Sequence, residues 1–506
     1  MGIGTVVRLG ICTAAASALL VGLPQPVAAT TSVALNAPAP APAAIGSLSD
    51  LIDQALADPF LVDATVGVRV LDLETGRVLY ERGAEQPLNP ASNVKMLTTG
   101  AALAILGPQH RYTTRVYSAN DARDGTTIKG NLYLKGSGDP NLVTGDLYEL
   151  AAKIAAQGVK KVGGVVVDST AFDTDELPPG FDQKTEMASY RAPSGATAVN
   201  FNTFVIRARA GEAVGDPVTA HVQPPLKWLD LSVKATTATG HRRKLWSEVE
   251  HRKDRVRLVL HGTTGVESGP QSFRYPVGDP SRYAGEMFVM ALRTAGIKVG
   301  RRTPTQGKTP KAADLIEAHR SAPLSVLVRS VNKFSNNFMA EQVLKTLDDH
   351  SPATFAGALA RVRAQLATMG VDPEGLVLGN GSGLYDNNRV SPMQMTTLLA
   401  AIYGDFRIRP DFLASLAVMG SDGTTRSRLA ETPAKGWVRV KTGTLNGISA
   451  LSGFAGAADR KPVVFSILMN DLPSGGTSKA RNVQNQIAEL LARHAAGLPL
   501  VLTETR

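Results

Sequence analysis

The chain has 506 residues, so two or three domains are expected rather than one. It carries 54 Lys and Arg against 44 Asp and Glu, a net charge of +10. Such a balance can attract a protein to anionic polymers or lipid head groups, although dispersed charge that only aids solubility fits equally well. The densest basic stretch, 241–257, also contains acidic residues and predicts a solvated β-hairpin. Nothing indicates nucleic-acid binding, and at most peripheral membrane association is expected.

Residues 1–29 are typical of a secretory signal. Arg8 supplies the positive start, residues 9–22 are apolar, and the Val-Ala-Ala at 27–29 fits a cleavage site. The apolar run of about 14 residues is too short to span a bilayer, which disfavours a membrane anchor. The only cysteine, Cys12, lies in this segment, so the mature protein would lack thiols for catalysis, disulfides or metal binding.

An Ala/Pro-rich segment at 30–47 predicts an extended linker before the first helix. The strand-like runs in 113–275 predict one or two β-rich subdomains, inserted into a domain made of 48–112 and 276–506. In chain order, the sequence predicts a helix over 48–57, a hairpin over 66–80, a helix over 92–106, a strand over 130–134, a helix over 147–157, a strand over 162–168, helices over 281–295 and 325–347, strands over 438–442, 450–456 and 463–469, and a helix over 479–494.

Three short motifs occur in a fixed order along the chain: Ser92-Asn93-Val94-Lys95, Ser335-Asn336-Asn337 and Lys441-Thr442-Gly443. They match the S-x-x-K, S-x-N and K-T-G pattern of enzymes that acylate an active-site serine. The first motif alone is weak evidence, because a chain of this length should contain about one or two S-x-x-K matches by chance.

A second S-x-x-K match is present at Ser330 and Lys333. It directly precedes Ser335, so it cannot converge on the S-x-N motif from a separate helix. We therefore interpret Lys333 as a structural or solvated residue.

Ser92 and Lys95 lie three residues apart, which places them on one face of a helix. A serine hydroxyl is a poor nucleophile and needs a base within hydrogen-bond reach. Lys95 can be that base if burial and a second cation, Lys441, lower its pKa. The helix dipole and the N–H groups of Ser92 and Thr444 are expected to stabilise the oxyanion. Taken alone, Ser92 is equally compatible with an ordinary helix N-cap.

The second motif offers a proton relay and an amide. Ser335 is predicted to pass a proton toward a leaving amine, and Asn337 to hydrogen-bond an amide backbone. Taken alone, this stretch is equally compatible with an amphipathic helix that begins with polar residues.

The third motif follows a strand-like run. Lys441 provides positive charge, and Thr442 and Thr444 offer hydroxyls to a substrate carboxylate. Gly443 allows the backbone of another segment to approach closely.

This arrangement resembles the class C low-molecular-mass penicillin-binding proteins, the D-Ala-D-Ala carboxypeptidase/endopeptidases of the penicillin-binding protein 4 type. Further similar stretches are the glycine-rich turn 136–142, the segment 167–173, and the pair 380–384 and 389–392. The resemblance implies a mixed α/β (α+β) β-lactamase/transpeptidase-like domain, an antiparallel sheet flanked by helices, with a large β-rich insertion. About 240 residues separate Ser92 from Ser335, which fits such an insertion.

The resemblance also implies a function. It predicts an exported, periplasmic serine D,D-peptidase that cleaves D-Ala-D-Ala termini or D-amino-acid cross-links of peptidoglycan through an acyl-enzyme on Ser92. Its partners would be peptidoglycan stem peptides, and β-lactams would be covalent inhibitors of the same serine. No metal and no organic cofactor is expected.

Substrate selection is the less defined part of this prediction. By resemblance, Asp168 or Asp173 holds the amino end of a diaminopimelate side chain, although either residue can instead cap a turn. Leu445 and Asn446 are expected to line that pocket. Two other functions stay open: a β-lactamase or esterase that uses the same serine, and a non-catalytic cell-wall-binding protein. The sequence contains neither the H-E-x-x-H motif of zinc peptidases nor the G-x-S-x-G motif of α/β-hydrolases.

Overall fold

The structure is a computed structural model that describes residues 7–8, 46–119, 122–252 and 255–502. Nearly all of the predicted signal and of the predicted linker lies outside the described residues. The chain forms two compact units, and each is described by itself. The described residues of 44–185, 190–202 and 276–506 form the larger unit, and those of 1–43, 186–189 and 203–275 form the smaller unit. The predicted insertion contributes to both units, and its boundaries stay a prediction.

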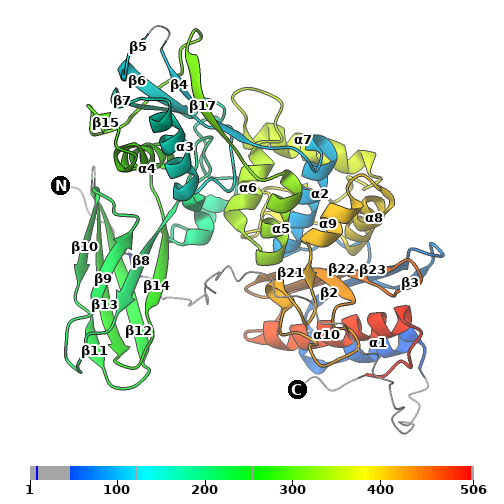
Figure 1. The fold of residues 1–506 in the computed structure, drawn as a ribbon. Helices are drawn as coiled ribbons and strands as arrows, with labels where there is room; N and C mark the ends of the chain where they lie inside the picture. Colours follow the sequence, from blue (N-terminus) through cyan, green and yellow to red (C-terminus); the bar gives the residue numbers. More distant parts are fainter. Residues whose placement is uncertain (1–6, 9–45, 120–121, 253–254, 503–506) are drawn as a thin grey trace, which may run out of the picture. The chain divides into compact units, whose positions relative to one another are not determined.

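A six-stranded antiparallel sheet forms the centre of the larger unit (Figure 1). From one edge to the other, its strands are β20 (Ala417–Val418), β21 (Val438–Leu445), β22 (Ile448–Ala455), β23 (Val463–Asn470), β2 (Thr65–Asp72) and β3 (Val78–Arg82). Every residue of β23 is buried, because helices cover both faces of the sheet at this strand. The predicted strands of this sheet are confirmed to within a few residues.

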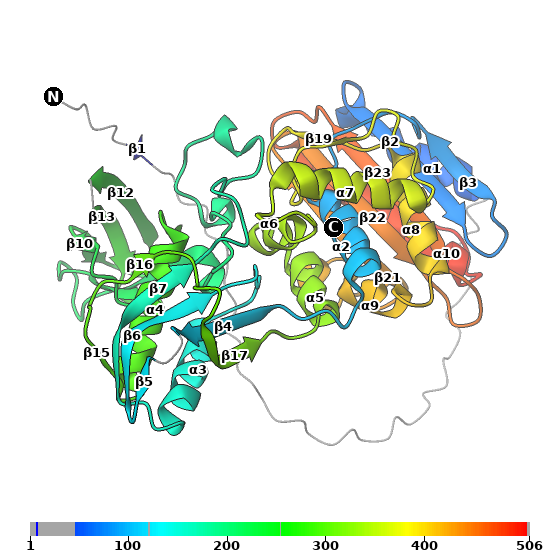
Figure 2. The ribbon, with the colours of Figure 1, turned by 90° about the horizontal axis from the view of Figure 1, so that it is seen from above.

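Helices cover both faces of this sheet (Figures 1 and 2). One face packs against α1 (Leu48–Leu56) and α10 (Gly476–Ala495), and alternate residues of β23 such as Phe465 and Ile467 belong to that core. On the other face, Phe454 and Val464 share one hydrophobic core with a layer of helices: α2 (Val94–Leu106), α5 (Leu324–Phe334), α6 (Asn337–Lys345), α7 (Phe355–Thr368), α8 (Pro392–Gly404) and α9 (Arg409–Ser415). A two-stranded ladder, β18 (Val377–Leu378) with β19 (Asn388–Arg389), lies between α7 and α8 in the chain. The expected sheet flanked by helices is therefore confirmed.

A second, mixed sheet of seven strands also belongs to the larger unit. Its strands are β4 (Thr113–Ser118), β5 (Arg123–Asp124), β6 (Thr127–Lys135), β7 (Lys161–Asp168), β15 (Lys298–Val299), β16 (Thr305–Gln306) and β17 (Asp314–Arg320). The helices α3 (Thr144–Ala156) and α4 (Pro280–Thr294) pack against each other beside it. This sheet combines strands from both sides of residue 275.

The smaller unit is made of strands. One sheet contains β1 (Val7–Arg8), β10 (Leu229–Val233), β11 (Thr236–Ala238), β12 (Arg243–Arg252) and β13 (Arg255–Gly265), and the other contains β8 (Thr203–Arg209), β9 (Thr219–Gln223) and β14 (Gln271–Pro276). The antiparallel pair β12–β13 is the hairpin that the basic stretch predicts. Within the described residues, no helix has both the length and the apolar character that crossing a membrane requires.

The largest departure from the predicted elements occurs at Ser335. The sequence predicts a continuous helical pattern over 325–347, but the structure has two helices, α5 and α6. Ser335 adopts a left-handed conformation (φ 57°), which ends α5, and Asn336 then caps α6 with its side chain. The break leaves Ser335 and Asn337 at the junction of two helices instead of inside one.

Candidate active site

Ser92 lies in a single 3-10 turn, η2 (Ala91–Asn93), that leads into α2. Side chains on either side hold this turn: Asn89 Oδ1 accepts the N–H of Ala91 at 2.9 Å, and the amide of Asn93 donates to Ser452 Oγ at 2.8 Å. Ala91 has a φ of 45°, which is unfavourable for a residue with a Cβ and persists only where the surroundings enforce it. Ser92 is thus presented by a strained and tightly held turn.

Lys95 connects the first motif to the second. Its Nζ donates to Ser92 Oγ at 3.0 Å and to Asn337 Oδ1 at 2.8 Å. A third bond of 2.6 Å goes to the carbonyl of Ser382. The side chain is 0% exposed, and burial lowers the pKa of Lys95 to about 7, against the opposing charge of Glu341. Near neutral pH a large fraction of Lys95 is therefore the free amine, within hydrogen-bond reach of a serine hydroxyl.

Lys441 connects the third motif to the second. Its Nζ donates to Ser335 Oγ at 2.9 Å and to the carbonyl of Thr442 at 2.7 Å. Burial, together with the charge of Lys95, holds the pKa of Lys441 well below its usual range. The five residues that the motifs predict as catalytic are thus joined by hydrogen bonds into two groups, one around each lysine, and the two lysines interact electrostatically.

Gly443 lies where β21 passes the turn that carries Ser92. A Cβ at this position would lie 2.6 Å from the carbonyl oxygen of Pro90, so no larger residue fits without displacing the backbone. This close approach brings the strand segment before Thr444 against the Ser92 turn, as the predicted oxyanion hole requires. Thr442 Oγ1 lies 2.9 Å from Thr424 Oγ1, and Thr444 is exposed.

The two predicted diaminopimelate ligands have other partners in the structure. Asp168 is 0% exposed and accepts hydrogen bonds from Thr170 Oγ1 at 2.6 Å and from the N–H of Thr309 at 2.8 Å. Asp173 forms an ion pair with the buried Lys345. None of these contacts involves Ser92 or either motif lysine, and the substrate role of both aspartates stays a prediction.

Leu445 and Asn446 lie where β21 turns into β22. Leu445 is the last residue of β21 and is paired with Ile448, and Asn446 is exposed in the two-residue turn between them. Gly447, the second turn residue, has a φ of 69°, as tight hairpin turns require. Both residues thus follow Thr444 directly at one end of the motif strand, and their role as pocket lining stays a prediction.

Two residues that interact with Lys95 have no role predicted from the sequence. They are Ser382 and Glu341. Ser382 lies in a segment recognised as similar to relatives, but its contribution is a backbone carbonyl, which a side-chain motif does not reveal. Glu341 has a visible signal: it is a charged residue among the mainly apolar residues that follow Asn337, and it lies four residues after Asn337 and hence on the same helix face. Lys333 of the chance S-x-x-K match forms an ion pair with Asp422 and has a structural role.

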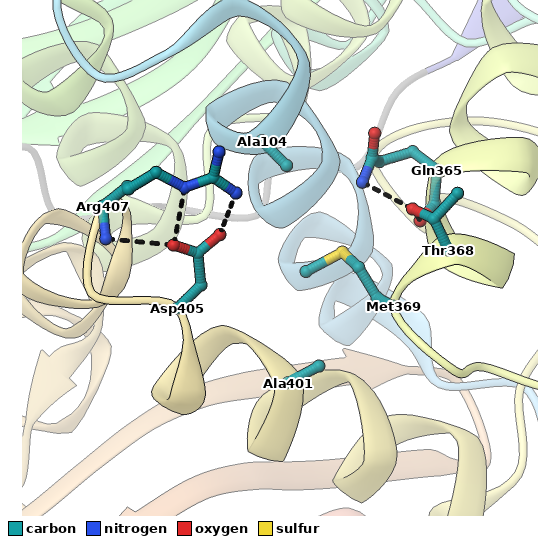
Figure 3. A pocket seen from close by; sticks show the side chains of 7 residues that line it. All are labelled: Ala104, Gln365, Thr368, Met369, Ala401, Asp405 and Arg407. Atoms are coloured by element: carbon teal, nitrogen blue, oxygen red, sulfur yellow. Dashed lines mark hydrogen bonds and ion pairs between the residues drawn. The ribbon is translucent and has the colours of Figure 1, made fainter.

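A pocket of about 420 Å³ lies at the far end of α2 from Ser92 (Figure 3). Its lining comes from the last turns of α2, α7 and α8 and the residues that follow, and the ion pair of Asp405 with Arg407 closes one side. No residue of the three motifs lines it. The chemistry of the motifs therefore does not depend on this pocket.

One group in the described part of the chain has donor atoms close enough together for a metal ion: Asp348, Asp349 and His350. Asp348 already accepts hydrogen bonds from the N–H and the hydroxyl of Thr354, at 2.8 and 2.9 Å. No contact joins this group to Ser92 or Lys95. Its side chains therefore have no evident part in the chemistry of the motifs.

Comparison with known proteins agrees with this geometry. The carboxypeptidase DacB of Mycolicibacterium smegmatis is 27% identical, covering 94% of this chain and 93% of the relative. The D-alanyl-D-alanine carboxypeptidase of Actinomadura sp. (strain R39) is 34% identical over 469 residues, or 90% of this chain and 86% of the relative.

A solved structure shows the same fold. The crystal structure of penicillin binding protein 4 (dacB) from Haemophilus influenzae superimposes with a TM-score of 0.75 and 25% identity, covering 89% of this chain and all (100%) of that chain. A complex of that protein with a β-lactam superimposes with a TM-score of 0.69. A family model matches residues 48–494, and the chain therefore belongs to the D-Ala-D-Ala carboxypeptidase 3 (S13) family.

Proposed function

We propose that this protein is an exported serine D,D-peptidase of the cell envelope. It cleaves D-Ala-D-Ala termini or D-amino-acid cross-links of peptidoglycan through an acyl-enzyme on Ser92, and β-lactams acylate the same serine. The observation that carries the proposal is the position of Lys95 Nζ, 3.0 Å from Ser92 Oγ and 2.8 Å from Asn337 Oδ1, in a buried site that lowers the pKa of this amine to about 7. The names of the relatives and the predicted signal segment support it.

The reaction begins when the neutral amine of Lys95 accepts the proton of Ser92 as Ser92 Oγ attacks the carbonyl carbon of the penultimate D-Ala. The backbone N–H groups of Ser92 and Thr444 stabilise the oxyanion. The amide C–N bond then breaks, and the proton that Lys95 accepted passes through the hydroxyl of Ser335, which Lys441 holds by a bond of 2.9 Å, to the leaving amine. Lys95 is thereby a free amine again. Water attacks the ester carbonyl of the acyl-enzyme and gives a proton to Lys95, and Lys95 returns it to Ser92 Oγ as the ester bond breaks and the shortened peptide leaves.

Arg481 lies beside Thr444, one of the hydroxyls that we expect to bind a substrate carboxylate, and Arg428 lies next to Arg481. Arg481 Nη2 lies 3.5 Å from Thr444 Oγ1, and Arg428 Nη2 lies 3.5 Å from the carbonyl oxygen of Arg481. Burial, with the charge of Arg481, lowers the pKa of Arg428 to about 10. Neither guanidinium forms an ion pair with a described acidic residue. An unneutralised cation beside an exposed hydroxyl, with a second cation next to it, favours a carboxylate ligand.

After the Gly-Ser-Gly-Leu stretch 381–384 the chain has Tyr385-Asp386, which offers a negative charge and no positive charge for a carboxylate ligand. Asp386 accepts a hydrogen bond of 2.6 Å from Arg389, so the negative charge of Asp386 and the positive charge of Arg389 neutralise each other. We therefore assign the recognition of the carboxylate next to the scissile bond to Thr442, Thr444 and Arg481.

Replacing Arg481 with alanine is expected to raise the KM for a peptide ending in D-Ala-D-Ala about tenfold, with a smaller change in kcat, since one charge-assisted hydrogen bond is lost at an exposed position. The Lys479→Ala variant, which removes an exposed charge from the same helix, is expected to leave KM unchanged. The measurement is initial-rate release of D-Ala. The same peptide with a C-terminal amide should bind both proteins equally weakly. An unchanged KM in the Arg481 variant would remove this residue from carboxylate recognition.

The proposed function is tested with the protein from the cell envelope fraction, where the signal segment predicts it. An N-acylated peptide ending in D-Ala-D-Ala should release D-Ala, and its L-Ala-L-Ala counterpart should stay intact. Incubation with benzylpenicillin should give a long-lived covalent adduct in the intact-protein mass spectrum. Rapid hydrolysis of penicillin without an adduct would instead indicate a β-lactamase. If neither reaction occurs in folded protein, the catalytic proposal fails and a wall-binding role takes its place.

A further inference from the structure

Glu341 is a carboxylate buried in the interior of the larger unit. It lies on α6, four residues after Asn337, and is 3% exposed among buried apolar neighbours such as Phe338 and Leu344. Burial raises the pKa of this carboxyl group. A carboxylate in such a place is costly unless hydrogen bonds satisfy both of its oxygens. Its partners therefore show what it holds in place.

Both oxygens of Glu341 bind one short backbone segment. Oε2 accepts the N–H of Gly381 at 2.9 Å, and Oε1 accepts the N–H of Ser382 at 2.7 Å. The carbonyl of Ser382 in turn accepts the bond of 2.6 Å from Lys95 Nζ. The next residue, Gly383, runs so close to the nucleophile turn that a Cβ there would lie 1.9 Å from the carbonyl oxygen of Ala91. The segment that Glu341 clamps thus touches both the base and the turn of the nucleophile.

Glu341 also contributes charge at this site. Two charged groups interact with Lys95: Glu341 from α6, which raises the pKa of Lys95, and Lys441 from β21, which is coupled to it by repulsion. The other groups that contact the Lys95 ammonium are uncharged, namely the hydroxyl of Ser92, the amide of Asn337 and the carbonyl of Ser382. Among the described residues, Glu341 is therefore the negative charge that favours the charged form of Lys95 and partly offsets the effect of its burial.

We infer that Glu341 is a positioning residue for acyl transfer: by clamping the 381–382 segment it fixes the Ser382 carbonyl, which holds Lys95 Nζ in reach of Ser92. This inference rests on the proposed function, because it assumes that Lys95 is the base. The clamp needs a carboxylate, since two backbone N–H donors face it and an amide would present its own N–H₂ to one of them. Misplacement of a catalytic group by about 1 Å can cost a factor of about 10² in rate.

The test is the pH profile of acylation by benzylpenicillin in the Glu341→Gln variant. Benzylpenicillin should acylate the wild-type protein faster as the pH rises through the pKa of Lys95, about 7, because only the free amine accepts a proton. In the variant, the rate on the alkaline plateau is expected to fall by about 10- to 100-fold. The rising limb should move to lower pH, since loss of a nearby negative charge lowers the pKa of a lysine.

A matched control separates positioning from mere stability. Glu489 is 1% exposed and lies on α10, on the opposite face of the sheet, where it binds Arg493 at 2.8 Å. The Glu489→Gln variant also loses a buried carboxylate. Its acylation rate on the alkaline plateau and the pH of its rising limb should nevertheless match those of wild type when the rate is expressed per folded molecule. If the Glu341 variant behaves like this control, the inference is wrong while the proposed function stands. If wild-type protein forms no adduct at any pH, the proposed function itself fails.

Discussion

Replacing Ser92 with alanine is expected to abolish the benzylpenicillin adduct and to lower the release of D-Ala by about 10⁴-fold or more. The reason is that no other hydroxyl contacts Lys95 Nζ among its described hydrogen bonds, which go to Ser92, Asn337 and a backbone carbonyl. The free energy of unfolding should change by less than about 1 kcal/mol, because the variant loses one hydroxyl at a partly exposed position. Intact-protein mass spectrometry and peptide assays measure both effects.

The chain provides its own control for this substitution. Ser330→Ala removes the serine of the second S-x-x-K match, which lies on α5 three residues before Lys333, the residue that forms an ion pair with Asp422. That variant should form the adduct at the wild-type rate. An adduct that persists in Ser92→Ala, or that maps by peptide mass to another residue, would contradict Ser92 as the nucleophile.

Replacing Lys95 with methionine is expected to slow acylation by benzylpenicillin by about 10²- to 10⁴-fold, the usual range for loss of a general base. Methionine keeps most of the buried volume of lysine but cannot accept a proton. The rise of the wild-type rate through the pKa of Lys95, about 7, should disappear as well. The measurement is the rate of adduct formation from about pH 5 to pH 9, with circular dichroism to confirm the fold.

Lys333→Met is the control for this variant. Lys333 is also a mostly buried lysine of an S-x-x-K sequence, at 8% exposure, and its loss should lower stability by breaking the ion pair with Asp422. The acylation rate of its folded fraction should keep the wild-type pH dependence. If Lys95→Met retains the rising limb, another group is the base, and Lys441, whose pKa is also lowered, is the first candidate to replace.

The sequence predicted most of the fold because its elements have strong local signals. The alternation of β2 and β3, the apolar runs of β22 and β23 and the closing helix α10 all lie within a few residues of their predicted bounds. The break at Ser335 was not predicted, because the run from Leu324 to Lys345 has continuous helical character and the left-handed backbone is stabilised by tertiary contacts such as the bond from Lys441.

At the site, too, features with a local sequence signal were predicted and features that depend on tertiary contacts were not. Ser92, Lys95 and Lys441 were found because the chemistry needs their side chains at fixed local spacings. Glu341 acts through the backbone of Ser382, and Arg481 reaches Thr444 from a helix that starts beyond β23, so neither contact is encoded in local spacing. Contacts between segments far apart in sequence decide these roles.

The pairing of β2 with β23 has a consequence for the moment at which the protein becomes active. These strands pair along their whole length, from Thr65 with Asn470 to Asp72 with Val463, so the first and last thirds of the chain build one sheet. The site likewise takes its nucleophile from the first third and Lys441 from the last. Contacts this distant in sequence form only after long loops close. A chain emerging from a ribosome or a translocation channel therefore carries Ser92 without its catalytic partners, and reactivity arises only when the nearly complete polypeptide has folded.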